Sequence, residues 1–249
     1  MSAARAELRG LLLLSALAAV GLAVLVGLGF WQLERRVWKE DLIARVEART
    51  KAPAVPIPAE ANWPNVSASR DEYRRVSASG RFQHAREALV YTVLPEPKGR
   101  FSGQGYWVLT PLELANGAIV IINRGFVPLE RKDPASRREG QSEGPVMVTG
   151  LLRMPEVTNW FTPANEPARG VWYQRDPAEI ARHFGLARVA SFMIDADAAP
   201  IPGLLPQGGE TRLVFANTHL GYALTWFGLA LALLGVFTVF AWQRLRGEH

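Results

Sequence analysis

The feature that most constrains this chain is an uncharged, mostly apolar run of 23 residues from Leu220 to Trp242. As a helix it is long enough to cross the roughly 30 Å of hydrocarbon in a bilayer. His219 stands directly before this run. At a helical rise of about 1.5 Å per residue, His219 lies about 18 Å from the middle of the run, at the membrane–water interface. We therefore expect a titratable, metal-ligating imidazole at the edge of a membrane helix.

A second uncharged run, Gly10 to Leu33, predicts another membrane helix. A cleaved signal peptide is the alternative, but the run is longer than a usual signal segment and no clear cleavage site follows it. Each run carries small residues on one helical face, namely Ser15, Ala19, Ala23 and Gly27 in the first and Gly221, Thr225, Gly228, Ala232 and Gly235 in the second. These stripes either pack the two helices together or simply reflect the Gly and Ala content of membrane helices.

Short basic flanks predict how the chain crosses the membrane. The basic residues that bracket the two runs are Arg5, Arg9, Arg244 and Arg246. By the positive-inside rule they lie in the cytoplasm, and a long segment between two spans translocates largely regardless of its own charge. The expected order is a cytoplasmic tail at 1–9, membrane helices at 10–33 and 220–242, an extracytoplasmic domain at 34–212 between them, and a cytoplasmic tail at 243–249.

Composition excludes several classes of site. The net charge is +5, from 28 Lys and Arg against 23 Asp and Glu, which suits a protein beside anionic lipid headgroups. No basic helix or stacking motif accompanies this charge, so nucleic acid is not an expected partner. The sequence contains no cysteine, which excludes disulfides, thiolate metal sites and metal transfer through Cys pairs.

Between the two runs the apolar pattern changes from helical to alternating. Residues 38–49 continue the first helix with an amphipathic pattern, and the prolines that follow predict an irregular linker at 53–64. Alternation then predicts short strands at 73–82, 89–94, 105–114, 118–126, 146–153 and 191–195, with a further candidate at 211–215. Asn116-Gly117 between two of them is a strong hairpin signal.

One short helix is expected at 177–184, with Asp176 as its N-cap and Gly185 as its stop. The polar segment 127–144 is predicted to be a flexible surface loop, and 156–175 is predicted to be a long connection between elements. About seven short strands and one helix favour an α+β, mainly antiparallel and barrel-like β domain. The expected fold is thus a membrane protein in which two transmembrane helices flank this domain.

The middle of the chain carries no known catalytic motif, so we expect a protein that is not an enzyme. His84 and His183 have no neighbouring ligands at metal-site spacing and are expected to be surface or structural histidines. Asp195 and Asp197 would share one face of a strand, but a turn or loop role is favoured over an acidic pair. Arg124 follows an apolar strand, where it either contacts an anionic group or caps a neighbouring loop.

Taken together, these blocks resemble the Surfeit-locus-one family, called Shy in yeast. The similarity begins with G-F-W-Q-L-E-R-R-V-W-K-E-D-L-I from Gly29 to Ile43. It continues in order through Y-R-R-V-S-A-S-G-R-F, G-Y-W-V-L-T-P-L, I-I-N-R-G-F-V-P, W-F-T-P-A-N-E-P, W-Y-Q-R-D and F-M-I-D-A. It ends with N-T-H-L-G-Y-A-L-T-W-F-G-L-A, which contains His219. A series of blocks in one order, from about residue 29 to 235, is far more specific than any single motif.

The resemblance implies an assembly factor for cytochrome c oxidase that binds haem a and assists its insertion into the catalytic subunit. The short N-terminus without a transit peptide fits a bacterial member in the inner membrane, with a periplasmic domain. The implied partners are the catalytic haem-copper oxidase subunit and membrane lipid, with a haem a synthase as a further candidate. The alternatives are a scaffold that carries no haem and stabilises an assembly intermediate, and a membrane-anchored enzyme acting on haem or lipid.

His219 is the residue that the resemblance carries over as a haem ligand, and imidazole is a usual axial ligand of haem iron. At 100° per residue, Trp226 lies within about 20° of His219 on the helix, and Ala223 and Ala230 are also near that face. Tyr222 lies close by in sequence. Trp31 and Gln32 end the first helix at the same depth and are expected to line the same site. The alternative is an interfacial histidine that hydrogen-bonds the loop or lipid, with Tyr222 and Trp226 as belt aromatics.

Overall fold

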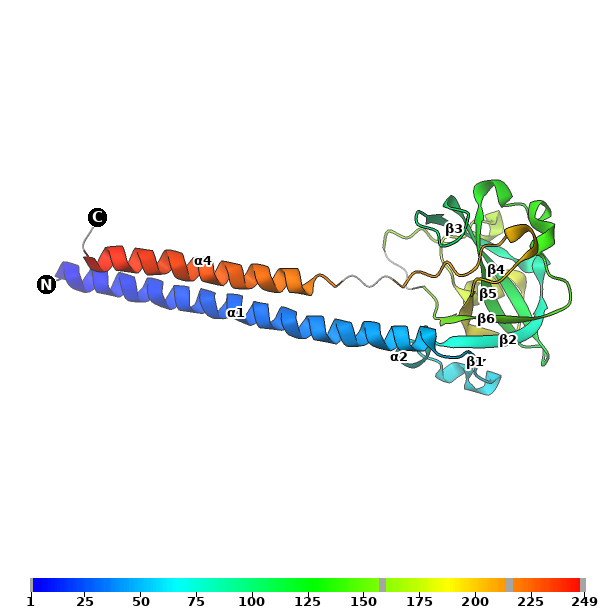
Figure 1. Cartoon of the computed structure of the whole chain (residues 1–249), viewed down its shortest axis with the longest axis horizontal. Helices are drawn as coiled ribbons and strands as arrows, with labels where there is room; N and C mark the ends of the chain where they lie inside the picture. The colour runs from blue at the N-terminus through cyan, green and yellow to red at the C-terminus, as the bar shows by residue number, and fades with distance from the viewer. Residues whose placement is uncertain (1, 157–159, 214–216, 247–249) are drawn as a thin grey trace. The chain divides into compact units, whose positions relative to one another are not determined.

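The computed structural model describes residues 2–156, 160–213 and 217–246 (Figure 1). The chain divides into two compact units. The first comprises Met1–Arg45 and Val214–His249, and the second comprises Val46–Leu213. The first unit is a pair of long helices, built from α1 (Ser2–Lys51) up to Arg45 and from α4 (His219–Arg246). The second unit holds the strands and the short helices.

The two long helices are the predicted membrane helices. By length and composition both could cross a membrane, since each contains an 18-residue stretch of high mean hydropathy, 2.5 in α1 and 2.1 in α4. Helix α1 continues without interruption to Lys51, as the amphipathic pattern of residues 38–49 predicted. The polar part of this helix is supported by ion pairs one turn apart, such as Arg36 with Glu40 at 2.7 Å.

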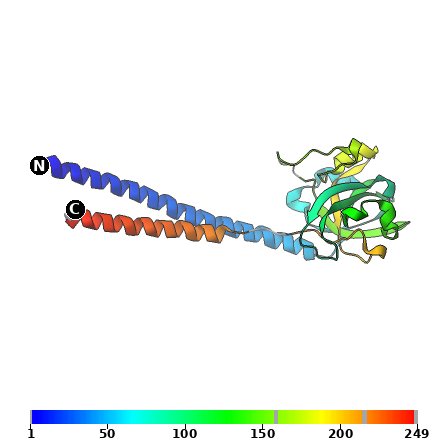
Figure 2. The ribbon, with the colours of Figure 1, turned by 90° about the horizontal axis from the view of Figure 1, so that it is seen from above.

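Helices α1 and α4 pack against each other in opposite directions. A Cβ atom at Gly21 would lie 3.3 Å from Leu233 Cδ2, and one at Gly29 would lie 2.5 Å from Phe227 Cε1. The Phe227 ring also meets Phe30 edge-on, with ring centroids 5.5 Å apart. As the residue numbers rise along α1, those of their partners fall along α4, so the beginning of α1 and the end of α4 lie at the same end of the pair (Figure 2).

The predicted packing stripes are not the contact face of this pair. On α1, Ala19, Ala23 and Gly27 are exposed, and on α4 all five members of the second stripe are exposed. The helices instead meet through Gly21 and Gly29, because only a residue without a side chain admits the bulky Leu233 and Phe227. Of the two interpretations of the stripes, the compositional one is correct for the contact between these two helices.

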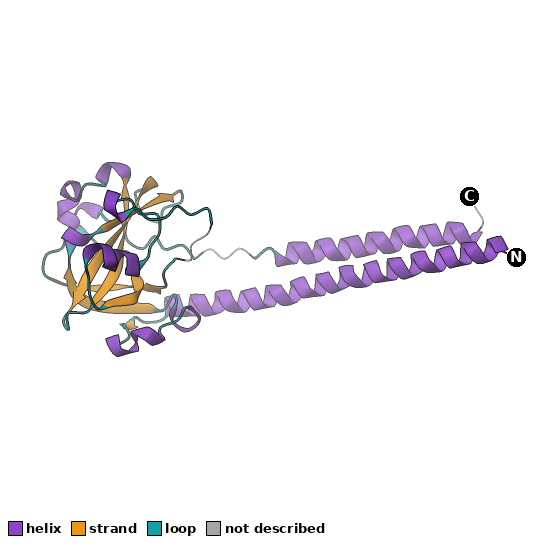
Figure 3. Cartoon of the chain, turned by 180° about the vertical axis from the view of Figure 1, so that it is seen from behind, coloured by secondary structure: helices purple, strands orange, loops and turns teal. Residues whose placement is uncertain are grey.

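The domain between the helices is a seven-stranded sheet in the order β1-β2-β6-β7-β5-β4-β3, and an additional pairing of β2 with β4 closes five of these strands into a barrel (Figure 3). The strands are β1 (Val55–Pro56), β2 (Arg75–Phe82), β3 (Ala88–Leu94), β4 (Gly103–Leu114), β5 (Ile119–Pro128), β6 (Pro145–Arg153) and β7 (Val189–Ala196). Within the barrel, neighbours are antiparallel except β5 and β7, which run parallel. A mainly antiparallel, barrel-like domain flanked by two membrane helices is thereby confirmed.

The core lies on both sides of the central strand β5. Strand residues alternate between faces, so Val120 and Ile122 point into the barrel, where they join residues from all four other barrel strands. Ile119 and Ile121 point outward into a second cluster beneath α3 (Pro177–Phe184). Burial on both faces explains the nearly continuous apolar sequence of this strand.

The local signals for turns and caps are confirmed. Gly117 has a φ of 77°, and its N–H donates to the Leu114 carbonyl, which closes the Asn116-Gly117 turn between β4 and β5. Helix α3 begins with the Asp176 side chain accepting from Ala178 N–H at 2.8 Å, and it ends at Gly185 with a φ of 61°. Both glycines occupy the left-handed region that a Cβ atom disfavours.

Three expectations for irregular segments are wrong in part. Residues 211–213 are not a strand, and 214–215 lie outside the described residues. Segment 127–144, predicted to be a flexible loop, contains the 3-10 turns η3 (Leu129–Arg131) and η4 (Pro134–Gly140) and buries Arg137 against Glu87. The linker at 53–64 contributes β1, which pairs parallel with β2, and the buried Trp63 of η1 (Glu60–Asn65). Tertiary contacts of Arg137 and Trp63 order these segments despite their polar or Pro-rich sequence.

Candidate functional site

The predicted ligand His219 is the first residue of α4. Its Nδ1 atom lies 2.7 Å from Oε1 of Gln32 on α1. Gln32 is almost fully buried and His219 is half-buried. The structure thus brings together two of the predicted site residues from opposite ends of the sequence, because the antiparallel packing places the end of one membrane run beside the start of the other.

This contact favours one tautomer of His219. An amide oxygen only accepts, so with Gln32 Oε1 facing the ring Nδ1 is the donor, and a neutral imidazole then keeps its lone pair on Nε2. No hydrogen bond to Nε2 is found within the described ranges. A histidine whose second nitrogen is anchored to a carbonyl oxygen is the usual arrangement for a metal-ligating imidazole, because the anchor fixes both the tautomer and the ring orientation.

The remaining predicted site residues divide into buried and exposed ones. Below His219, Ala223 and Ala230 are buried at 1% and 4% exposure, and Trp226 between them is half-buried. Tyr222 and Trp31 are 57% and 53% exposed. The face with the two alanines and Trp226 is therefore the one covered within the helix pair, whereas Tyr222 and Trp31 lie on its surface, as belt aromatics do.

Two polar atoms near His219 are buried without a partner. Among the described residues, four buried side-chain nitrogen or oxygen atoms have no hydrogen-bond partner, and two of them belong to the chain around His219. These are Oδ1 of Asn217 and Nε1 of Trp226. Buried polar atoms in proteins are normally paired. Asn217 is a residue that sequence reasoning missed; its place in N-T-H, two residues before the histidine, was the available signal.

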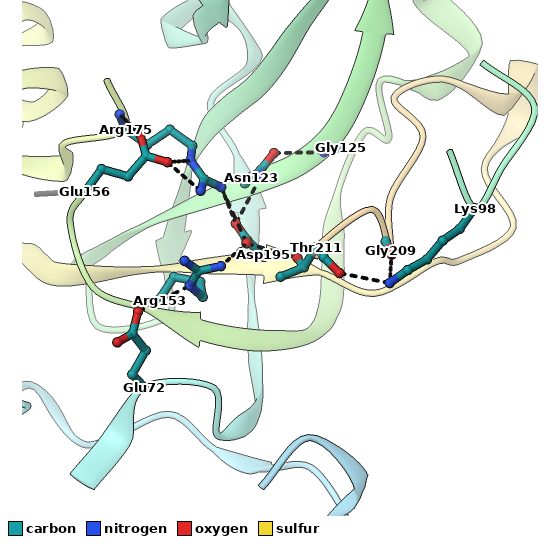
Figure 4. Close-up of polar contacts among 10 residues, drawn as sticks. All are labelled: Glu72, Lys98, Asn123, Gly125, Arg153, Glu156, Arg175, Asp195, Gly209 and Thr211. Carbon is teal, nitrogen blue, oxygen red and sulfur yellow. Dashed lines mark hydrogen bonds and ion pairs between the residues drawn. The ribbon is translucent and has the colours of Figure 1, made fainter. Parts of the chain in front are cut away.

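The β domain contains a second concentration of polar side chains, centred on Asp195 of β7 (Figure 4). This carboxylate is 2% exposed and accepts hydrogen bonds from Asn123 Nδ2 at 2.9 Å and from the Thr211 hydroxyl at 3.0 Å. It also pairs with Arg153 at 3.3 Å and Arg175 at 3.2 Å. The expected turn or loop role is wrong for Asp195, which is a buried strand residue. Its signal was the apolar run Phe192–Ile194 directly before it.

The two arginines connect this centre to the surface. Arg175 donates to Glu156, and Arg153 lies 3.5 Å from Glu72. Burial alone would lower the pKa of Arg175, but the charges of Asp195 and Glu156 outweigh it and raise that pKa. Arg153, Arg175 and Asp195 line a polar cavity of about 240 Å³ beside β3 and β7. Because donors from four different segments occupy the Asp195 carboxylate, the cluster fixes those segments to one another.

Arg124 and His84 form a third polar group, between β5 and η4. Arg124 donates to the Gly140 carbonyl and lies 3.3 Å from His84 Nδ1. Of the two interpretations left open for Arg124, the loop cap is the one found. Burial lowers the pKa of Arg124 to about 10, so it stays charged at neutral pH. An arginine can only donate, so His84 accepts at Nδ1 and donates from Nε2 to the Ser142 carbonyl at 3.0 Å. The structural role expected for His84 is consistent with these contacts.

Comparison with known proteins identifies the group to which the chain is similar. The family model described as "SURF1 family" matches residues 19–231, a range that includes Gln32, Trp226 and His219. Surfeit locus protein 1 of Homo sapiens is 38% identical over 218 residues, covering 83% of this chain and 70% of the relative. The Rattus norvegicus protein of that name is 35% identical over 232 residues, covering 89% and 72%. A SURF1-like protein of Monosiga brevicollis is 36% identical over 86% of this chain and 82% of its own. The chain therefore belongs to the SURF1 family.

Proposed function

We propose that the chain is a cytochrome c oxidase assembly factor that binds haem a at His219 and assists its insertion into the catalytic haem-copper oxidase subunit. Membership of the SURF1 family, a family of oxidase assembly factors, supports the first part. The observation that carries the second part is the hydrogen bond from His219 Nδ1 to Gln32, which leaves Nε2 free to ligate a metal. The role is that of a carrier and not of an enzyme.

The residues around His219 fit a haem. When bound, haem a would supply an iron atom that can take a neutral imidazole as ligand. His219 would hold that iron through Nε2, and Gln32 would keep the ring in the required tautomer. Ala223 and Ala230 lie on the same side of α4 and are covered within the helix pair, and they add no polar group that would compete with a ligand. The interfacial depth of His219 lets polar edges of the ligand reach the aqueous phase.

The location follows from the same arrangement. The proposed cellular location is the inner membrane of a bacterium, with both termini in the cytoplasm and residues 46–213 in the periplasm. The antiparallel pairing of α1 and α4 supports termini on one side of the membrane. The proposed partners are the catalytic oxidase subunit, a haem a synthase as the source of the ligand, and membrane lipid around the helix pair.

The test is to co-express the chain with a haem a synthase, purify it and extract the pigment. His219→Ala should remove the haem a absorption band, because the only ligand that the chain is proposed to supply is lost. The matched control is His183→Ala, which removes an exposed histidine of α3 and should leave the band unchanged. An unchanged haem content in the His219 variant contradicts the ligand assignment.

A second function is a scaffold that stabilises an oxidase subunit intermediate without carrying haem. The observation that favours it is an aromatic pair on the surface of the β domain, Trp160 at 96% and Phe161 at 67% exposure, of the kind that anchors protein contacts. This function predicts that the oxidase subunit co-purifies equally well with the wild-type chain and with His219→Ala. It also predicts that replacing Trp160 and Phe161 by serine abolishes the co-purification.

A further inference from the structure

Trp226 carries a buried hydrogen-bond donor with no acceptor. It lies on α4, and its Nε1 atom is buried without a partner among the described residues. An indole N–H can donate but cannot accept. Leaving such a donor unpaired in an apolar environment costs free energy, so buried indoles usually find an acceptor. A belt tryptophan would direct its N–H to the wet interface, whereas this one is enclosed.

The position of Trp226 relates it to His219. Seven residues separate the two, which is two helical turns, so they lie on the same side of α4 about 10.5 Å apart along its axis. Ala223 and Ala230, the buried residues on either side of Trp226, add no polar atoms. Trp226 thus lies two helical turns further along α4 than the proposed ligand His219, on the same side of the helix and deeper in the membrane.

Helix α1 offers the indole few hydrogen-bond acceptors. Between Gly10 and Leu33 of α1, the side chains with a polar atom are Ser15, Trp31 and Gln32. Gln32 Oε1 is already engaged by His219. Trp31 is exposed and can only donate. Ser15 precedes Gly21, which packs against Leu233, so it lies opposite the later part of α4 and is distant from Trp226. The helical carbonyls are used within the helices, so α1 supplies no acceptor among the described residues, and a ligand can supply one.

We infer that Trp226 donates a hydrogen bond to the formyl oxygen of haem a held by His219, and that this bond selects haem a over haems without a formyl group. The inference rests on the proposed function. Among the three related haems, haem b has neither a formyl group nor a hydroxyfarnesyl tail, haem o has the tail alone, and haem a has both. A carbonyl oxygen on the rim of the macrocycle is the acceptor that a donor-only side chain requires.

The experiment compares binding of haem b, haem o and haem a by the purified full-length chain in detergent. In Trp226→Phe we expect the affinity for haem a to fall about three- to tenfold, the worth of one neutral hydrogen bond, while haem b and haem o bind as in wild type. The formyl C=O stretching band of the haem a complex should move to higher frequency in resonance Raman spectra. The matched control is Trp242→Phe on the same helix, which is 51% exposed and should change neither quantity.

Each other outcome overturns the inference in a distinct way. Equal losses for haem a and haem o would assign the bond to the hydroxyl of the tail, and equal losses for all three would reduce Trp226 to packing. An unshifted formyl band in the Phe variant shows that no such bond existed. If the Trp226→Phe variant does not fold, the wild-type complex provides the test. A formyl stretching frequency in that complex equal to that of free haem a in an apolar solvent would also exclude the hydrogen bond. A wild-type chain that binds no haem a at all refutes the proposed function itself.

Discussion

Gln32 Oε1 and His219 Nδ1 lie 2.7 Å apart although 187 positions separate the two residues in the sequence. The bond joins α1 to the first residue of α4 at the point where the chain enters its second membrane helix. It does two things at once, since it ties the helices together and fixes the imidazole tautomer with Nε2 free. The structural and ligand-binding roles of this pair can be separated by experiment.

Replacing Gln32 should weaken haem binding without removing the ligand. In Gln32→Leu the imidazole loses its anchor, and we expect haem affinity to fall about 10- to 100-fold, the usual effect of removing such a partner. Optical titration of the purified protein measures this. Gln243→Leu, an exposed glutamine near the other end of α4, is the control and should bind haem as wild type. Equal affinities in Gln32→Leu and the control would show that the bond does not support ligation.

Packing of the helix pair should depend on Gly29 but not on Gly27. A Cβ atom at position 29 would lie 2.5 Å from the Phe227 ring, whereas nothing lies within 4 Å of one at position 27. Both Gly→Ala changes raise helix propensity alike, so their difference isolates the contact. We expect Gly29→Ala to be less stable than Gly27→Ala by about 1–3 kcal/mol. Thermal unfolding in detergent, followed by circular dichroism, checks this, and equal midpoints would refute the packing face.

The Asp195 cluster should be a main determinant of domain stability. Asp195→Asn leaves two largely buried arginines without their shared carboxylate, and we expect a loss of about 3–5 kcal/mol, as for other broken buried ion pairs. Asp197→Asn is the matched control, because Asp197 and its partner Arg75 are 32% and 39% exposed. Such a pair contributes at most about 1 kcal/mol. Urea unfolding of the full chain compares the two, and similar midpoints would contradict the assignment of Asp195 as the centre.

The β domain should lose stability in mild acid through His84. Burial, reinforced by the charge of Arg124, lowers the pKa of His84 below its ordinary value of 6.5, although the Ser142 carbonyl and Glu87 act the other way. Between the two pKa values the unfolded chain binds a proton that the folded chain does not. The stability that neutral His84 gives the folded domain is therefore fully present above about pH 6.5. It declines as the pH falls through that value towards the lower pKa of His84 in the folded state.

The measurement is the unfolding midpoint of the full chain at pH 7.5 and pH 5.5. His84→Gln should reduce the difference between the two midpoints, whereas His183→Gln on the surface of α3 should not. A pH dependence that is the same in wild type and His84→Gln would show that other groups determine the acid response.

Local chemistry in the sequence predicted the elements well. Strands, the Asn116-Gly117 turn and helix α3 with its Asp176 cap follow from side-chain alternation and from the backbone freedom of glycine. These signals act over a few residues, so they do not depend on which distant residues pack against the element. The two membrane helices are determined in the same way, since only an apolar helix satisfies its backbone within hydrocarbon.

The errors share one physical origin. Arg137 lies in a polar segment, and Asp195 lies in a predicted strand but was expected to serve a turn or loop, yet each is buried because an opposite charge from a distant segment meets it there. Likewise, the small-residue stripes are real, but the contact face was decided by which glycine faces Phe227. A sequence read in short windows contains no information about such long-range partners.

The sequence alone therefore determined the two long apolar runs, the strands and the place of His219 directly before the second run. Only the tertiary structure decided that Gln32 meets His219 and that Trp226 is enclosed with its N–H unpaired. The reason is that both facts depend on the relative rotation of α1 and α4. That rotation is set by side-chain packing between the helices and not by the periodicity of either one.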